Sequence, residues 1–247
     1  LWLRHSVGSN PTTPAKIPQN RLKPLTLSDF VVIYNRGLLK GVLYMKTIEQ
    51  IKEKALDEHI PIIMDDTLEV VGKILEDKKP ERILEIGTAV GYSAIMFSKY
   101  LIENGYIDTI ERDEERIKEA KENVKDLNLE EKIHIFEGDA IEILPTLKGP
   151  YDVVFIDAAK GKYPIFLSEA LRMLGNNGII VADNVLYKGY VMSDYNKHKQ
   201  RTAVRGLREF LKELNENENL TTQILEVGDG LAISKKMWEV VRWIKES

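Results

Sequence analysis

The chain has 247 residues, a formal net charge of −4 and no cysteine; 43% of its residues are hydrophobic and 30% are charged. Without cysteine it forms no disulfide, no thiolate zinc site and no cysteine nucleophile. No apolar run is long enough to span a bilayer, and the hydrophobic fraction is too high for a disordered chain. We expect a cytoplasmic protein with no membrane partner and a single folded domain.

The first 44 residues differ from the rest. They hold six basic residues and one acid, a net charge of +5, which leaves −9 on the other 203 residues. Prolines are scattered through residues 1–24 without a helical or strand period, a composition that buries too little surface to offset the entropy of ordering. We therefore predict that residues 1–44 are a disordered or non-native extension and that residues 45–247, from the first methionine, form the domain.

Four interpretations of this extension stand. The favoured one is an upstream extension of the reading frame, because Gly8-Ser9-Asn10-Pro11 looks like a translated T-loop end of a tRNA gene. A basic RNA-binding arm comes second. The others are a flexible tail and a targeting sequence. A targeting sequence is the weaker of these, because residues 1–44 lack the apolar segment and the cleavage site that such sequences carry.

From Met45 onward the periodicity predicts two helices and then alternating strands and helices. In chain order these are helices 46–58 and 65–77, strand 82–86, helix 91–103, strand 106–110, helix 113–127, strand 133–136, helix 139–147, strand 153–156, helix 163–174, strand 178–182, helix 196–215, and strands 222–227 and 231–235.

The strand patterns predict the arrangement of the sheet. Continuous apolar strands separated by helices indicate a parallel sheet that is buried on both faces. The last two strands flank Gly228-Asp229-Gly230, which is typical of a hairpin. We predict an α/β, Rossmann-like fold with a mostly parallel seven-stranded sheet and an antiparallel C-terminal hairpin.

A glycine-containing turn follows the first strand, in Glu85-Ile86-Gly87-Thr88-Ala89-Val90-Gly91-Tyr92-Ser93, and opens a helix. A helix N-terminus there presents free N–H groups to an anion. The acid Glu111 ends the second strand, where it would accept both hydroxyls of a ribose. These features favour nucleotide binding over a purely structural turn, but they do not separate NAD from S-adenosylmethionine. The third glycine of the dinucleotide fingerprint is missing, which disfavours an NAD-dependent oxidoreductase.

Asp139 follows the third strand in Gly138-Asp139-Ala140. Its carboxylate is placed to meet the exocyclic amine of adenine. On its own, the favoured interpretation is a cap on the next helix.

Oxygen-bearing side chains end the fourth and fifth strands. Asp157 follows the fourth strand, and Asp183-Asn184 follow the fifth. Because the carboxyl ends of parallel strands face one crevice, we expect these side chains to converge. Such hard oxygen ligands suit Mg²⁺ or Mn²⁺; the alternative is that each acid caps the next helix or turn. Lys160 lies one turn from Asp157, and a nearby cation would lower the pKa of its ammonium, so that it could serve as general base. The alternative interpretation of Lys160 is an ordinary surface lysine exposed to solvent.

Together these residues resemble the cation-dependent O-methyltransferase family of the catechol and caffeoyl-CoA type, over about residues 48–236. The resemblance rests on residues 85–93, Glu111, 138–140, 156–160, 183–184 and 228–231. It implies a class I S-adenosylmethionine-dependent methyltransferase fold, catalysis by Lys160 and Asp157, and a homodimer. It implies a Mg²⁺ or Mn²⁺ site made by Asp157, Asp183 and Asn184. It also implies cofactor contacts from Met64, Glu85, Gly87, Thr88, Gly91, Ser93, Glu111, Asp139, Ala140 and Asp157.

A basic segment separates the substrate alternatives. Residues 188–212 hold seven basic residues and two acids, and part of this charge forms one face of a helix. A solvated helix face is the ordinary meaning of such a run. Because this basic face follows the predicted metal residues, we expect it to border the active site, where it favours binding of a phosphate backbone. This segment resembles most closely the bacterial tRNA 5-hydroxyuridine methyltransferases. We therefore predict the anticodon loop of tRNA as partner, and a small catechol-like or hydroxycinnamoyl substrate as the alternative. A non-catalytic RNA-binding module is disfavoured by the metal residues. The predicted RNA contacts are Lys188, Lys197, Lys199, Arg201, Arg205 and Arg208.

Overall fold

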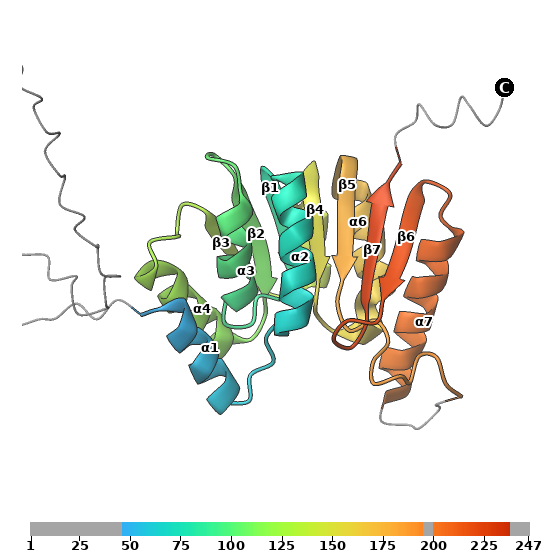
Figure 1. Ribbon diagram of the computed structural model, residues 1–247, viewed down its shortest axis with the longest axis horizontal. Helices are drawn as coiled ribbons and strands as arrows, with labels where there is room; N and C mark the ends of the chain where they lie inside the picture. Colours follow the sequence, from blue (N-terminus) through green and yellow to red (C-terminus); the bar gives the residue numbers. More distant parts are fainter. Residues whose placement is uncertain (1–45, 195–199, 238–247) are drawn as a thin grey trace, which may run out of the picture. The chain divides into compact units, whose positions relative to one another are not determined.

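A seven-stranded sheet forms the centre of the protein (Figure 1). The computed structural model describes residues 46–194 and 200–237, and all statements below concern these residues. The strand order is β3-β2-β1-β4-β5-β7-β6. The strands are β1 Arg82–Ile86, β2 Tyr106–Glu111, β3 Ile133–Glu137, β4 Tyr151–Ile156, β5 Leu174–Ala182, β6 Leu220–Leu225 and β7 Leu231–Lys236.

The pairing within this sheet confirms the predicted fold class. Strands β1 to β5 pair in parallel, and β7 runs antiparallel to both β5 and β6. Because the first five strands point the same way, their carboxyl ends all reach one edge of the sheet, where ligands bind in folds of this kind.

Helices cover both faces of the sheet. They are α1 Ile48–Asp57, α2 Asp65–Lys78, α3 Tyr92–Phe97, α4 Glu114–Asp126, α5 Ala140–Ile143, α6 Tyr163–Met173 and α7 Arg201–Glu216. The core on one face joins buried side chains of α1 to α4 to β1, β2, β3, β4 and β5. The other core joins α6 and α7 to β1, β4 and β5. Successive residues of a strand therefore alternate between two buried layers, which explains why the strands have continuous apolar sequences.

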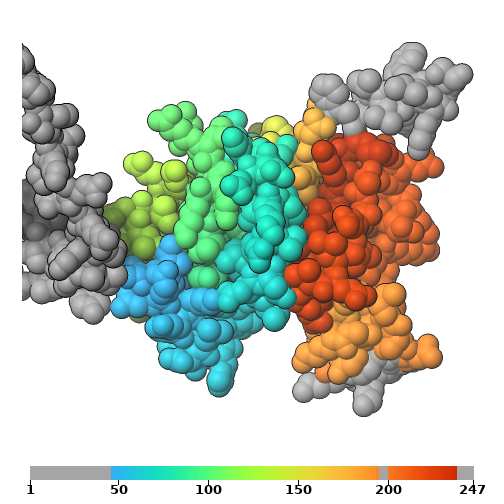
Figure 2. Space-filling model, viewed as in Figure 1, coloured from blue at the N-terminus to red at the C-terminus, as the bar shows by residue number. Residues whose placement is uncertain are grey.

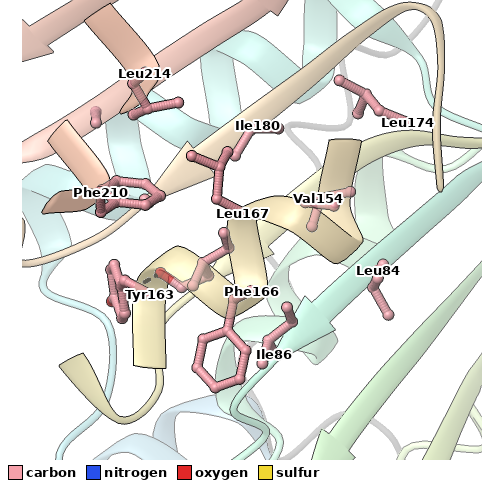
Figure 3. Packing of buried hydrophobic residues seen from close by; sticks show 14 of the residues in the cluster. Leu84, Ile86, Val154, Tyr163, Phe166, Leu167, Leu174, Ile180, Phe210 and Leu214 are labelled. Carbon is pink, nitrogen blue, oxygen red and sulfur yellow. Dashed lines mark hydrogen bonds between the residues drawn. The ribbon is translucent and has the colours of Figure 1, made fainter. Parts of the chain in front are cut away.

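The core behind α6 and α7 packs large side chains closely (Figure 3). Tyr163 of α6 is fully buried and meets Phe210 of α7 edge to face, with ring centroids 5.2 Å apart. Leu167 and Leu214 belong to the same cluster. This packing fixes α6, and with it the turn that precedes α6 at the sheet edge.

Element boundaries differ from the predictions where polar side chains or strand pairing override the hydrophobic period. Helix α3 ends at Phe97 because the chain tightens into a 3₁₀ turn, in which the Ser98 hydroxyl donates to the carbonyl of Ile95. Strand β5 begins at Leu174 because that residue pairs with Tyr151, ahead of a register shift.

Two further predicted segments are shorter or displaced. The predicted helix 139–147 is the short α5 followed by a 3₁₀ turn that contains Pro145. Strand β6 ends at Leu225, because Val227 is already part of the turn and accepts a hydrogen bond from the N–H of Gly230. The extension at residues 1–44 and the start of the predicted helix 196–215 lie outside the described residues.

Candidate active site

A cavity of about 630 Å³ lies at the carboxyl edge of the parallel strands. Its walls come from the segment after α1, the ends of the five parallel strands β1 to β5, and the tip of the β6–β7 hairpin. In Figure 2 the outline of the molecule is notched along this edge, between the blue residues of α1 and the orange residues that follow β5. A cavity of this size accommodates a cofactor or drug-sized ligand.

Gly87 makes the floor of the cavity because no other residue fits there. Its φ is +109°, and a Cβ at this position would lie 2.1 Å from the carbonyl oxygen of Asp157. The ends of β1 and β4 therefore touch through backbone atoms. This contact brings Asp157 beside the glycine turn, where Thr88 also lines the cavity.

Glu111 lines the cavity at the end of β2, as predicted. Its carboxylate accepts three backbone N–H groups, from Ala89 at 2.8 Å, Arg112 at 2.9 Å and Asp113 at 3.0 Å. Two carboxylate oxygens offer about four acceptor positions, so one position is left for a ligand hydroxyl, where the prediction had Glu111 accept both hydroxyls of a ribose. The same bonds fix the glycine turn against β2.

Two of the predicted cofactor contacts, Glu85 and Gly91, do not line the cavity but lie behind its wall. Glu85 is fully buried and accepts hydrogen bonds from Ser93 and Thr109, each at 2.5 Å. Burial raises the pKa of Glu85 to about 7. Gly91 is the N-cap residue of α3 and brings Ser93 to the cavity. The carboxylate thus orients the Ser93 hydroxyl from below.

Asp139 is the predicted helix cap and also lies at the cavity, where its contact with adenine stays a prediction. Its side chain accepts the N–H of Ile141 at 2.9 Å and caps α5, and the residue also lines the cavity together with Ala140. On the opposite wall Met64 lines the cavity at the start of α2 and is 53% exposed.

The three predicted metal residues all line the cavity. Backbone bonds from Asp157 to Ile86 and from Asp183 to Ile156 extend the ladder past the strand ends, which sets the two acids side by side at neighbouring strands. Burial, and then the charge of Asp157, raise the pKa of Asp183 to about 6. Asn184 follows in a left-handed conformation with φ of +56°.

These donors fit a hard divalent cation. A cation would relieve the repulsion between Asp157 and Asp183 that contributes to the raised pKa. Within the described ranges no group of three or more His, Cys, Asp or Glu side chains is arranged so that it could hold a metal ion. The predicted set has two carboxylates and the amide of Asn184.

Lys160 lies beside this set. Its Nζ donates to Asp157 Oδ1 at 2.6 Å and to the Tyr163 hydroxyl at 3.0 Å. Burial lowers the pKa of Lys160, but the opposing effects of Tyr163 and Asp157 are larger together, so the net direction is upward. The predicted lowering depended on the charge of a bound cation, and the groups of the protein act in the opposite direction.

Tyr163 supports the site from behind the cavity wall and was not among the predicted residues. Its buried hydroxyl lies 2.8 Å from the carbonyl oxygen of Asp183 and 3.2 Å from that of Ile156, in addition to its bond with Lys160. It therefore links the lysine to the ends of β4 and β5. The spacing Asp157, Lys160, Tyr163, three residues apart on one turn, was a signal that could have revealed it.

The predicted RNA contacts divide into three groups. Lys188, Arg201 and Arg205 are exposed. Arg208 is engaged within the protein, since its guanidinium donates to the carbonyl of Val191 at 3.0 Å, to that of Tyr190 at 3.1 Å and to that of Ser193. Lys197 and Lys199 lie outside the described residues.

Among the described residues, no helix is long and apolar enough to cross a membrane.

The strand order, the glycine turn and the acid that ends β2 define a class I S-adenosylmethionine-dependent methyltransferase. The sequence profile of the O-methyltransferase family matches residues 43–237, so the chain belongs to that family. The comparisons therefore confirm the predicted enzyme class and exclude the NAD-dependent alternative.

Individual relatives support this assignment. The chain is 37% identical over 163 residues to the catechol O-methyltransferase of Niastella koreensis, across 62% of this chain and 72% of the relative. A candidate caffeoyl-CoA O-methyltransferase from Staphylococcus aureus shares 34% identity and the fold, with a TM-score of 0.72 over 77% of this chain and 92% of the other. The O-methyltransferase TomG from Streptomyces achromogenes, solved with S-adenosylmethionine, shares 25% identity with a TM-score of 0.70, over 77% and 89%.

Proposed function

We propose that this O-methyltransferase is cation-dependent and methylates 5-hydroxyuridine at the wobble position of tRNA to 5-methoxyuridine. The predicted contacts of Met64, Ser93, Glu111, Asp139 and Ala140 with the cofactor belong to the same proposal. The functional unit is the chain from Met45, working in the cytoplasm as a homodimer.

The observation that carries the tRNA proposal is the exposed basic face of α7 next to the cavity. Gly206 of α7 packs so closely on the turn at Lys160 that a Cβ there would lie 2.8 Å from the Lys160 carbonyl oxygen. Arg201 and Arg205 project from the neighbouring face of the same helix, and Lys162 adds an exposed cation at the cavity rim. Exposed cations on a helix that packs against the Lys160 turn suit a phosphate backbone whose base enters the site.

The chemistry of the acceptor agrees with the donor set. The 5-hydroxyl and 4-carbonyl of 5-hydroxyuridine are neighbouring oxygens, as the two hydroxyls of a catechol are. A divalent cation held by Asp157, Asp183 and Asn184 would supply Lewis acidity and orient these oxygens. An anticodon-loop base is unpaired, so it is splayed into a pocket at low cost.

The protein's own residues position the reaction and handle the proton. As an ammonium, Lys160 is placed to stabilise the oxyanion of the acceptor, because its Nζ bonds Asp157 and Tyr163 beside the cavity; it would take the acceptor proton itself only where a bound cation lowers its pKa. S-adenosylmethionine bound in the same cavity would supply the methyl group, which would pass to the acceptor oxygen with release of S-adenosylhomocysteine. Alignment and charge stabilisation are the main contributions expected from the protein.

A small catechol-like acceptor is the second candidate. The 37% identity to a catechol O-methyltransferase favours it, since that relative's name states such a substrate. The apolar wall at Pro61, Ile62 and Ile63 would suit a small aromatic ring.

A transfer assay separates the two candidates. Labelled S-adenosylmethionine is incubated with the enzyme and either tRNA carrying 5-hydroxyuridine, the same tRNA with unmodified uridine, or catechol, each with and without Mg²⁺. We expect label only in the hydroxylated tRNA and only with Mg²⁺. Transfer to catechol alone would contradict the tRNA proposal, and equal transfer without added metal and with a chelator would contradict cation dependence.

A further inference from the structure

The tip of the β6–β7 hairpin, residues 226–230, lies between two walls of the cavity. On one side the N–H of Gly228 donates to Asp66 Oδ2 of α2 at 3.1 Å, next to Met64. On the other side the carbonyls of Asp229 and Gly230 accept the N–H groups of Leu186 at 3.0 Å and Val185 at 2.9 Å. The hairpin tip therefore joins the start of α2 to the segment after the metal residues.

Gly230 allows this close approach. Its φ is +91°, and a Cβ there would lie 2.4 Å from Cγ of Leu186. Any larger residue would push the hairpin away from the segment that it holds.

The segment held by the hairpin has an unusual backbone. Tyr187, Lys188 and Gly189 are three consecutive residues in the left-handed region, with φ of +45°, +57° and +72°. Residues other than glycine adopt this conformation at an energetic cost, and a bulky tyrosine does so rarely. Such strain persists where surrounding contacts enforce it, and it gathers at ligand sites.

Asp229 supplies the enforcing contact. Its Oδ1 accepts the N–H of Lys188 at 2.5 Å, in the middle of the left-handed run. Beyond this run the N–H of Tyr190 bonds to the carbonyl of Tyr187, and the two rings meet edge to face at 6.0 Å. Both Tyr187 and Asp229 line the cavity. Tyr187 follows Asp183 and Asn184 in the chain, and β7, which follows Asp229, is separated by β1, β4 and β5 from β2, which Glu111 ends.

We propose that Asp229 is a positioning residue for the acceptor: through the Lys188 N–H it holds Tyr187 in the left-handed turn that presents this aromatic side chain as the acceptor wall of the cavity. Tyr187 then selects a planar ring as the acceptor, because flat unsaturated rings stack on aromatic side chains. The inference rests on the proposed function in placing the acceptor on this side of the cavity.

The test compares Asp229→Ala and Asp229→Asn with Glu226→Gln. Glu226 is an exposed acid on the same hairpin tip and does not line the cavity. We expect Asp229→Ala to raise the KM for the acceptor about tenfold or more, since it removes a charge-assisted hydrogen bond. The KM for S-adenosylmethionine should change less than about twofold, Asp229→Asn should fall between, and Glu226→Gln should behave as wild type.

A second measurement is independent of activity. Lys188 is exposed, so trypsin cleavage after it, followed by mass spectrometry of the released peptides, reports how firmly the turn is held. Cleavage after Lys188 should become about tenfold faster in Asp229→Ala but not in Glu226→Gln.

Two results would overturn the inference: an unchanged cleavage rate after Lys188 in folded Asp229→Ala, or equal rises in the KM for acceptor and cofactor. Circular dichroism checks folding, and Asp229→Asn keeps the test open if the alanine variant does not fold. If the wild-type enzyme methylates neither tRNA nor catechol, the proposed function fails, while the cleavage rates still decide the role of Asp229.

Discussion

Two carboxyl groups beside the cavity have raised pKa values, and each has a different role at the residue scale. Glu85 is fully buried behind Ser93, and Asp183 is 2% exposed at the cavity wall. Burial is the largest cause of the upward shift in both. Glu85 has hydroxyl partners that stabilise its charge, whereas Asp183 faces a second carboxylate. The first is therefore a structural acid, and the second is suited to a cation.

Glu85 should make the stability of the protein depend on pH near neutrality. Its pKa is raised from 4.5 to about 7, so the folded state binds a proton more tightly than the unfolded state. The resulting stabilisation is full below about pH 4.5 and is lost as the pH rises through about 7. It amounts to about 3 kcal/mol at most. Glu85→Gln should flatten the fall in the free energy of unfolding between these pH values, measured by urea denaturation.

Asp183 also lowers the free energy of unfolding as the pH rises, but at lower pH than Glu85, because its pKa is raised from 3.8 to about 6. Asp183→Asn is therefore measured in parallel to separate the two groups. An unchanged pH slope in Glu85→Gln would contradict the assignment.

Asp157→Ala should abolish methyl transfer without preventing cofactor binding. The change removes a proposed cation ligand and the ion-pair partner of Lys160 at 2.6 Å. We expect activity to fall more than about 100-fold, and Mn²⁺ affinity measured by electron paramagnetic resonance to fall with it. Calorimetry should show S-adenosylmethionine still bound. Asp126→Ala, an exposed acid at the end of α4, is the matched control. Unchanged Mn²⁺ affinity in Asp157→Ala would refute the metal site.

Helix α7 shows how one element serves several purposes at once. Its apolar face buries Val204, Leu207, Phe210 and Leu214 in the core. A second face packs on the turn at Lys160, and the basic face remains in solvent. Within that basic face Arg208 ties the segment at residues 190–193 to the helix. Arg201 and Arg205 are exposed and do not bond this segment, so they are the arginines to test for RNA binding.

Charge reversal at Arg201 and Arg205 should weaken tRNA binding and reduce its salt dependence. Each lost phosphate contact lowers the slope of log K against log salt by about 0.7–0.9, so the double variant should lose about 1.5 in slope. Filter binding over a range of salt concentrations measures this. Lys118→Glu with Lys125→Glu makes the same change of charge on exposed positions of α4. Equal losses in both double variants would indicate a general charge effect and contradict a site on α7.

At the scale of the whole molecule, the cavity depends on segments from almost the entire described chain. Its walls include residues from Pro61 through to Asp229. Five parallel strands bring their ends to it, and the hairpin tip lines it through Asp229. A ligand bound there contacts parts that separate on unfolding, so its binding should stabilise the domain as a unit.

S-adenosylhomocysteine should therefore raise the melting temperature. At a concentration one hundred times its Kd, the gain in the free energy of unfolding is about 2.7 kcal/mol. For a domain of this size that corresponds to about 5–10 °C in differential scanning fluorimetry. NAD at the same concentration is the control and should have no effect. Equal stabilisation by NAD would contradict selectivity for the methyl-donor cofactor.

The sequence predicted the elements and their order because these depend on local patterns. Continuous apolar strands indicated a sheet buried on both faces, and the Gly228-Asp229-Gly230 turn indicated the antiparallel hairpin. Since parallel strands bring their carboxyl ends to one edge, the topology alone predicted that Asp157 and Asp183 would converge. The structure places both at the cavity wall.

Only the tertiary structure decided what several of these side chains contact. It placed Glu85 behind Ser93, engaged Arg208 with residues 190–193, and joined Lys160 to Tyr163. It also brought Asp229 to the Lys188 N–H, 41 positions away in the sequence. Periodicity reports which face a side chain takes, whereas a hydrogen-bond partner depends on how separate elements pack. The sequence therefore predicts the family and the general chemistry, while the hydrogen bonds that position the reacting groups depend on the packed fold.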